Sequence, residues 1–372
     1  MIRLAKPDID DADVAAVAEV LRGGFLVQGP RVAEFERQVA ARVTAEYGVA
    51  VANCTAALHL AMLSLEVGPG DAVAVPAYSW PATANAVALC GAEAVFVDID
   101  PITWNMDPDA LEIVLGTRSH VKAVLPVHAF GGMADMIAIR RAADEHGIPV
   151  VEDAACALGA KLDGHPAGSW GRIGCFSFHP RKSITTGEGG MLVTSDLHVA
   201  RRCRALRNHG LDPDSPEPDF IMPGYNLRLT EMQGALGLAQ LEKLDRILEH
   251  RRIVAGWYAQ TLAGMDVTLP VESAPGSHVY QAYVVLLSAN VASRRAEIVS
   301  ALKAAEVETT IGTHHQPLTH YFRQRGPHRL GEFPVTDSVA ARALALPLHS
   351  AICREDVAIV AERLADALRT AA

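Results

Sequence analysis

The sequence predicts an α/β protein whose large domain is built on a mostly parallel sheet flanked by helices. The length of 372 residues fits one large and one smaller domain with a substantial core. From Val49 onward, short β-rich runs alternate with helical stretches, which is typical of a parallel sheet with helices on both faces. The β-rich runs are residues 49–52, 72–76, 94–97, 123–127, 150–152, 175–178 and 190–194.

A change in composition beyond about Gly264 indicates a smaller α+β domain at the C-terminus. We expect the large domain to span residues 1–245 and the smaller one residues 246–372, linked by a helix that begins near residue 230. Crossover rules place the carboxyl ends of the parallel strands, and the motifs that follow them, along one edge of the sheet.

The segment before the first β-rich run predicts two helices. Residues 10–21 have helical spacing of apolar side chains, and Gly23-Gly24 ends this helix. A short arm follows at residues 25–30, and a second helix is expected over residues 32–43.

Charge and cysteine content exclude several classes of protein. The formal net charge is -10 and there is no run of Lys or Arg, which argues against a nucleic-acid or membrane-surface role. The six cysteines lack CxxC spacing, so we expect reduced thiols in a cytoplasm and no zinc or other metal site.

The N-terminus does not resemble a secretory signal peptide. The uncharged stretch 72–92 is broken by Pro76, Pro81 and polar residues, so we expect strand, turn and helix there and no membrane span.

The strongest chemical candidate is Lys182, in the stretch GCFSFHPRKSITTGEGGM from Gly174 to Met191. Residues 175–178 suit a buried strand, and Pro180 forces the chain to turn, so Lys182 is expected near the strand's end. A partly desolvated amine there can lose its proton near neutral pH and form a Schiff base with an aldehyde. The alternative, a solvated surface lysine, is favoured for any lysine taken alone.

A carboxylate and an anion site accompany this lysine in the sequence. Residues 150–155 read as a buried parallel strand that ends in Glu152-Asp153, and Asp153 can pair with a pyridinium nitrogen. Asn53 and Thr55 open an apolar helix after a strand, so backbone amides and the Thr55 hydroxyl can hold a phosphate. An ordinary N-cap is the alternative for this third feature.

Two further candidate side chains follow predicted elements, one after a strand and one after a surface loop. Trp80 lies in the segment Tyr78 to Pro81 that follows the run 72–76, and it can stack on a planar ring, with core packing as the alternative. Asn226 follows the polar, proline-rich stretch 208–224, which predicts a surface loop, and taken alone it is a turn asparagine.

The C-terminal part predicts a β-rich segment at residues 283–287, a helix at 294–305 and a closing helix from Glu355. The stretch Thr313 to Tyr321 contains His314, His315 and His320, but no carboxylate at ligand spacing. A solvated or substrate-facing role is therefore favoured over a metal site.

Five motifs, in this order along nearly the whole chain, closely resemble the DegT/StrS-type sugar aminotransferases, which are pyridoxal-phosphate enzymes of fold-type I. They are NCTAALHLA, PAYSWPATANAV, VVEDAACALGA, FSFHPRKSITTGEGG and PGYNLRLTEMQGALG.

The resemblance implies a role for each candidate residue. Lys182 would hold the cofactor and shuttle a proton, and Asp153 would keep the pyridine nitrogen protonated. Thr55, Ala56 and Ser177 would bind the phosphate, Trp80 would cover the ring, and the loop before Gly224 would lie over an active site. Asn226 would reach the phosphate in the neighbouring subunit, which requires a homodimer.

The chain departs from the family pattern at two positions. Cys54 stands where the family usually has glycine, and Cys156 where it usually has a glutamine that helps to hold the cofactor's ring hydroxyl. Cysteine is a weak donor, so this contact would need a water or a neighbouring group. Lys182 itself argues against the family's dehydratase branch, which has histidine at this position.

The implied reaction is a ping-pong transfer of an amino group through the pyridoxamine form of the cofactor. The expected donor is glutamate and the expected acceptor a keto-sugar, most often nucleotide-linked in this family. A keto-cyclitol or another unlinked ketone remains an alternative acceptor. A non-catalytic cofactor-binding regulatory protein is the alternative from a different class.

Overall fold

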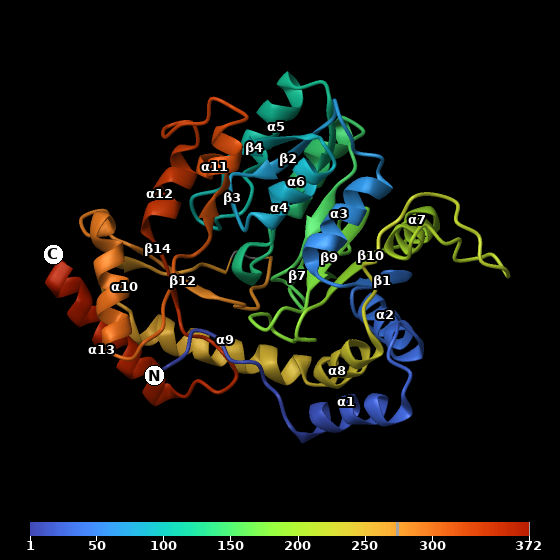
Figure 1. Ribbon diagram of the computed structural model, residues 1–372. Coiled ribbons are helices and arrows are strands. Elements are labelled where there is room, and N and C mark those ends of the chain that lie inside the picture. The colour runs from blue at the N-terminus through green and yellow to red at the C-terminus, as the bar shows by residue number, and fades with distance from the viewer. Residues whose placement is uncertain (273–274, 372) are drawn as a thin grey trace.

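The computed structural model describes residues 1–272 and 275–371, and its central feature is a mixed sheet in the order β1-β10-β9-β6-β5-β2-β4 (Figure 1). Isolated bridges Val124 to Val150 and Val127 to Asp153 join its two halves. The strands are β1 (Tyr47–Val51), β2 (Ala72–Pro76), β4 (Glu93–Val97), β5 (Val121–Val124), β6 (Val151–Asp153), β9 (Ile173–Ser177) and β10 (Gly190–Thr194).

The predicted α/β class with a mostly parallel sheet is confirmed, and β10 is the antiparallel exception. Residues 178–189 connect β9 to β10 without a helix. Parallel neighbours need a crossover connection, usually through a helix, so this direct connection makes β10 antiparallel. Lys182 lies in this connection, at the edge where β6 and β9 end.

Helices cover both faces of the sheet. On one face α2, α5, α6 and the start of α9 pack on Ala50, Ala74 and Val193, and on the other α3, α4 and α7 pack on Val49, Val73 and Leu192. Adjacent strand residues face opposite sides, which is why they belong to different clusters. The helices of this part are α1 (Asp11–Gly23), α2 (Pro30–Arg42), α3 (Cys54–Ser64), α4 (Ala82–Leu89), α5 (Pro108–Thr117), α6 (Met136–Glu145), α7 (Leu197–Arg207) and α8 (Glu231–Glu242).

The predicted helix from near Thr230 is in fact two helices. Thr230 caps α8 through Gln233, as the sequence indicates, but α8 ends at Glu242, and Lys243 separates it from α9 (Leu244–Thr261). The Lys243 ammonium contacts Asp10 at 3.0 Å and Asp13 at 2.5 Å, which ties the junction to α1. A single long helix was therefore wrong, because side chains distant in sequence fix the break.

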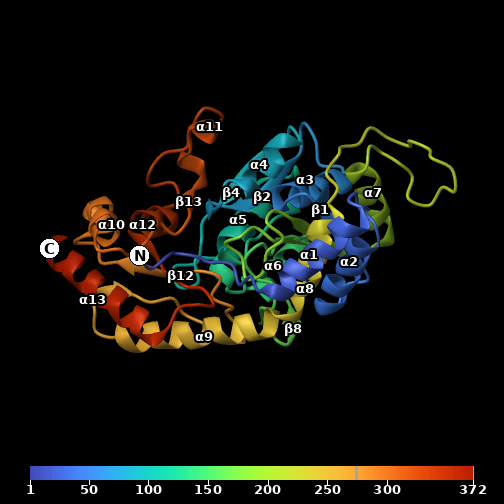
Figure 2. The same ribbon diagram turned by 60° about the horizontal axis from the view of Figure 1, so that its bottom comes forward.

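The C-terminal part contains the antiparallel sheet β11-β12-β14, packed with α9, α10 and α13 in one hydrophobic cluster. In Figures 1 and 2, α9 runs along the bottom of the molecule from α8 toward this cluster. The boundary at residue 245 stays a prediction. The elements here are β11 (Val267–Thr268), β12 (Tyr283–Leu287), β14 (Ala343–Leu346), α10 (Arg295–Ala304), α11 (His320–Arg323), α12 (Pro334–Arg342) and α13 (Arg354–Ala371).

Short strands that the sequence did not predict bring distant segments together. β3 (Tyr78–Ser79) pairs with β13 (His314–His315), and β7 (Lys161–Leu162) pairs with β8 (His165–Pro166). The stretch 72–92 forms a strand (β2) and a helix (α4) joined by a turn, as expected, and β3 lies within that connection. Within the described residues, no helix is long and apolar enough to cross a membrane.

Candidate active site

Lys182 lies on the β9–β10 connection with a fixed backbone and a half-buried side chain. Its amide donates to the carbonyl of His179 at 2.8 Å, and the Thr185 hydroxyl donates to the carbonyl of Phe178 at 2.8 Å. Its Nζ lies 3.0 Å from Sγ of Cys156. The turn expected at Pro180 is therefore present.

Asp153 ends β6 and is buried, with 5 % of its surface exposed. Its Oδ2 accepts from the Thr83 hydroxyl at 2.8 Å, and its Oδ1 accepts from the Ala155 amide at 3.2 Å. Burial raises the pKa of its carboxyl, while Thr83, the Ala155 amide and the charge of Lys182 act in the opposite direction. A cationic ring nitrogen would relieve this burial cost.

Opposing influences act on the pKa of Lys182. Burial by itself lowers it, but the facing Cys156, Cys54 and Asp153 raise it, and the net direction is upward. This direction is opposite to the lowered amine pKa that the sequence predicts. Desolvation is present, as expected, but the neighbouring groups from α3, β6 and the loop after β6 outweigh it.

The preceding carboxylate, Glu152, points to the opposite side of the strand and has a structural role. It accepts from the amides of Gly168, Trp170 and Gly171 at 2.7–2.8 Å and from Nε2 of His128 at 2.9 Å. Glu152 and His128 are both fully buried. Successive side chains of a strand point to opposite faces, so in β6 Glu152 binds a loop while Asp153 faces the site.

The N-terminus of α3 is the part of the site where the sequence predicts phosphate binding, and that role stays a prediction. The Asn53 side chain accepts from the Ala56 amide at 2.9 Å, so this amide, which we expected to bind phosphate, is already paired. The first-turn amides of Cys54 and Thr55 have no intrahelical acceptor, as at the start of any α-helix. The backbone of Gly190 lies so close that a Cβ there would be 2.4 Å from the carbonyl carbon of Asn53.

Ser177 lies at the end of β9, in the same strand as Cys175, which pairs with Asp153. Its hydroxyl oxygen accepts from the His179 amide at 3.4 Å. The side chain is half-buried and lies on the strand that leads to Lys182.

Trp80 is 60 % exposed, so the alternative of core packing is excluded. Its ring contacts that of His314 edge to face, with centroids 5.3 Å apart. Pairing of β3 with β13 causes this contact, since His314 is the partner of Ser79. The exposed ring is free to cover a planar ligand.

Asn226 is exposed, and its backbone bridges to Asn208. The loop between α7 and this point extends away from the body of the molecule in Figures 1 and 2. Both features suit a side chain that reaches another subunit, and that role stays a prediction.

Sequence reasoning missed Thr83, His128 and Gln316. Thr83 is completely buried and joins Ser79 to Asp153 through its hydroxyl. Its place in the first turn after the Trp80 motif was a usable signal. Gln316 is also completely buried and donates to the carbonyl of Pro76 at 2.8 Å, a contact across 240 residues that no local pattern indicates.

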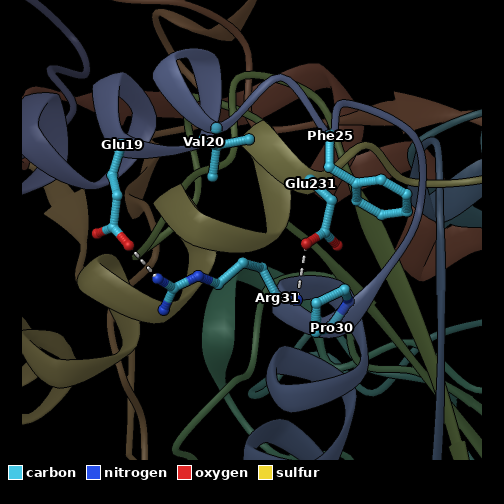
Figure 3. Close-up of a pocket in the computed structure, with 7 residues that line it drawn as sticks. Glu19, Val20, Phe25, Pro30, Arg31 and Glu231 are labelled. Atoms are coloured by element: carbon cyan, nitrogen blue, oxygen red, sulfur yellow. Dashed lines mark hydrogen bonds and ion pairs between the residues drawn. The ribbon is translucent and has the colours of Figure 1, made fainter.

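A cavity of about 430 Å³ lies away from this site, among α1, α2 and α8 (Figure 3). Its polar groups are paired: Arg31 contacts Glu19 at 2.6 Å, and Glu231 accepts from the amides of Gly29, Arg31 and Val32 at 2.7–3.0 Å. Glu231 thus caps the N-terminus of α2, and the cavity offers no reactive group.

The residues at the sheet edge fit a phosphorylated pyridine aldehyde. Lys182 supplies an amine, and Asp153 supplies a buried carboxylate whose ionised form is disfavoured by burial. The N-terminus of α3 supplies backbone amides for the phosphate. Trp80 supplies an exposed aromatic face. Cys156 cannot replace both hydrogen-bonding functions of a glutamine, and it contacts Lys182 instead.

The model of the DegT/DnrJ/EryC1/StrS aminotransferase family matches residues 7–365. The chain is 37% identical over 362 residues to a GDP-perosamine synthase of Caulobacter vibrioides, covering 96% of this chain and 95% of the relative. It is 36% identical to a UDP-N-acetyl-3-dehydro-alpha-D-glucosamine 3-aminotransferase of Acidithiobacillus ferrooxidans, covering 94% and 92%. It is also 36% identical to a pleiotropic regulatory protein of Geobacillus stearothermophilus, covering 98% and 95%.

The fold matches solved structures over its whole length. A Streptococcus pneumoniae protein described as a sugar aminotransferase in its PMP form superposes with a TM-score of 0.95 at 26% identity, covering 100% of both chains. The PLP form of the same protein superposes with a TM-score of 0.94 at 27% identity, covering 100% of this chain and 99% of that one. The fold-type I architecture and the pyridoxal-phosphate cofactor are confirmed.

Proposed function

Because the chain belongs to the DegT/DnrJ/EryC1/StrS aminotransferase family, we propose that it moves an amino group from glutamate to a nucleotide-linked keto-sugar. The family is pyridoxal-phosphate dependent, and the chain is a transaminase of this family. The identity of the donor and the nucleotide linkage are our proposals.

The observation that carries the proposal is the convergence of Lys182, Asp153 and the N-terminus of α3 at one edge of the sheet. When bound, pyridoxal phosphate supplies an aldehyde for the donor's amine and a ring that withdraws electrons from its α-carbon. Asp153 would hold a proton on the ring nitrogen, because a buried carboxylate favours a cation beside it.

Lys182 would serve as the group that takes up and returns the proton at the donor's α-carbon. Its short, hydrogen-bonded backbone turn fixes the stem, so that only the end of the side chain needs to move. Sγ of Cys156 lies 3.0 Å from this amine and would help to orient it.

Thr55, the first-turn amides of α3 and Ser177 would bind the phosphate, and the partner subunit's Asn226 would complete the site in a homodimer. Ala56 contributes its amide only if the Asn53 cap gives way. The exposure of Asn226 supports a role in the partner's site.

The acceptor's nucleotide linkage is supported by a basic segment beside Trp80. Residues 314–329 contain four histidines and three arginines but no acidic residue, in a chain of net charge -10. Arg323, Arg325 and Arg329 are exposed, and His314 contacts Trp80. The three arginines suit the phosphates of a nucleotide sugar, whereas an unlinked keto-cyclitol has no group that needs them. The names of two relatives, which include GDP and UDP, agree with this choice.

A regulatory binding protein is the second candidate, because one relative is named a regulatory protein. It predicts cofactor binding without amine transfer. The intact set of Lys182, Asp153 and Thr55 favours catalysis.

The test is a half-reaction with full-length, cofactor-loaded protein. Glutamate should bleach the visible absorbance band of the bound aldehyde form, and Lys182→Ala should remove this bleaching. A panel with UDP-linked, GDP-linked and unlinked keto-sugars then defines the acceptor. Binding without bleaching by any amino donor would favour the regulatory role, and turnover of unlinked cyclitols alone would reject the nucleotide linkage.

We also infer a cytoplasmic location, since all six cysteines are unpaired.

A further inference from the structure

The contact between Cys156 and Lys182 is the shortest sulfur hydrogen bond within the described residues. Its length is 3.0 Å, against 3.2 Å for Cys353 with Asp356, 3.4 Å for Cys90 with a carbonyl and 3.7 Å for Cys203 with a carbonyl. A thiol and a primary amine, from segments 26 residues apart, thus lie within direct reach of each other.

Cys156 combines partial exposure with an amine partner, whereas Cys90, which is also half-buried, faces a backbone carbonyl. Cys54, Cys175 and Cys203 are buried, and the exposed Cys353 faces a carboxylate. Cys156 is half-buried and faces the Lys182 amine, which is also half-buried. Partial exposure beside a cation is the environment in which thiols are oxidised selectively.

We propose that hydrogen peroxide joins Cys156 to Lys182 through a sulfur–nitrogen bond when Lys182 is not occupied by the cofactor. In the first step the sulfur attacks one peroxide oxygen, the O–O bond breaks and one water leaves, which gives a sulfenic acid. Sulfur loses two electrons and the peroxide gains them.

In the second step the Lys182 ammonium first gives a proton to solvent, and the neutral amine then attacks the sulfur. The S–N bond forms, the S–O bond breaks, and the hydroxyl leaves as water with a proton from the amine. The net reaction consumes one thiol, one amine and one peroxide and releases two waters. The sulfenic acid and the amine are already in contact, so no other thiol needs to reach the site.

The linkage removes the amine that the proposed function requires, and thiols reverse it. Two thiol molecules restore Cys156 and Lys182 and leave as a disulfide. The further expectation that the cofactor protects Lys182 rests on the proposed function, whereas the linkage in cofactor-free protein does not.

The test uses cofactor-free, full-length Cys353→Ser protein, which lacks the exposed competing thiol. After treatment with hydrogen peroxide, intact mass should fall by two hydrogen atoms, and peptide mapping should find the Cys156 and Lys182 peptides joined. Dithiothreitol should restore the original mass. Added pyridoxal phosphate should suppress the joined peptide at least tenfold.

Matched variants separate this linkage from other products. Cys54→Ser should still form it, because a Cys54–Cys156 disulfide has the same mass change but needs Cys54. Cys156→Ser and Lys182→Arg should not form it, and Lys182→Arg should accumulate sulfenic or sulfinic acid at Cys156. Near-ultraviolet circular dichroism checks that each variant is folded.

Oxygen addition to Cys156 without a joined Lys182 peptide would overturn the proposal, as would a disulfide that disappears in Cys54→Ser. A linkage that forms without protection by the cofactor would keep the proposal and count against the role of Lys182 in the proposed function. Bleaching by glutamate without any sulfur–nitrogen linkage would overturn the proposal and support the role of Lys182 in the proposed function.

Discussion

Asp153 and Glu152 are adjacent in one strand, and their environments give them different roles. Glu152 is surrounded by four hydrogen-bond donors, whereas Asp153 accepts from Thr83 and one amide and faces Lys182. The sequence predicted that the second carboxylate of the pair is the functional one, and the alternation of a strand explains why only one of the two can face the site. Thr83, which orients Asp153, could not be predicted with equal ease, because a threonine at a helix start is common.

Asp153→Asn should slow the glutamate half-reaction by on the order of 100-fold, the scale of losing one electrostatic contact at a reacting centre. The amide keeps the shape but cannot hold a proton on the ring nitrogen. Stopped-flow absorbance of cofactor-loaded protein measures this rate. A rate equal to that of the wild type would exclude Asp153 as the partner of the ring nitrogen.

The same substitution should stabilise the cofactor-free protein at neutral pH. The pKa of Asp153 is raised above its usual 3.8 in the folded state, so folding takes up a proton and the ionised form opposes folding. The stability that this group contributes is fully present below pH 3.8 and is lost as the pH rises through the raised folded-state pKa. Urea unfolding at pH 7 and pH 4 should therefore show that the gain from Asp153→Asn shrinks at the lower pH. An equal gain at both pH values would contradict the raised pKa.

Glu152→Gln is predicted to reduce stability instead, by about 1–3 kcal/mol, because an amide nitrogen would face donors and leave at least one buried group unpaired. Denaturant unfolding measures the loss. The half-reaction rate per folded, cofactor-loaded molecule should change less than tenfold, and a loss as large as in Asp153→Asn would assign Glu152 a role in the chemistry.

At the scale of elements, the connection between β9 and β10 determines where Lys182 lies. The β9–β10 connection, which has no helix, makes β10 antiparallel, turns the chain at Lys182 and brings Gly190 against the start of α3. The longer strands were predictable from runs of apolar residues. The two-residue strands β3 and β13 and the break at Lys243 were not, because they depend on partners more than 200 residues away.

Gly190→Ala should weaken cofactor binding about tenfold or more, since its Cβ would lie 2.4 Å and 2.6 Å from the backbone of Asn53 and Cys54 and displace the phosphate-binding turn. Fluorescence titration with pyridoxal phosphate measures the dissociation constant. Gly256→Ala is the matched control, because its Cβ would meet nothing within 4 Å and alanine favours the helix. Equal affinities in the two variants would reject this role of Gly190.

At the scale of the whole molecule, exposed side chains suggest that the site is completed by a second copy. Phe25, Phe220 and Tyr225 are 54 %, 63 % and 43 % exposed, although they are aromatic. The family resemblance indicated the dimer and the role of Asn226, but composition and periodicity contain no information on which surfaces meet another chain.

Mixing two inactive variants tests this arrangement. Lys182→Ala and Asn226→Ala should each lose activity alone, while a co-expressed mixture should recover about a quarter of the wild-type sites, because half of the dimers are mixed and one of their two sites is intact. Coupled assay of amine transfer measures recovery. No recovery, with mixed dimers shown by mass spectrometry, would mean that Asn226 serves its own chain.

The most direct test of the central claim is reduction of the cofactor-loaded, full-length protein with borohydride, followed by peptide mapping. Lys182 is predicted to carry the reduced cofactor as a stable adduct, and Asp153→Asn should carry it on the same residue. An adduct on another lysine, or none in protein that holds the cofactor, would contradict the account.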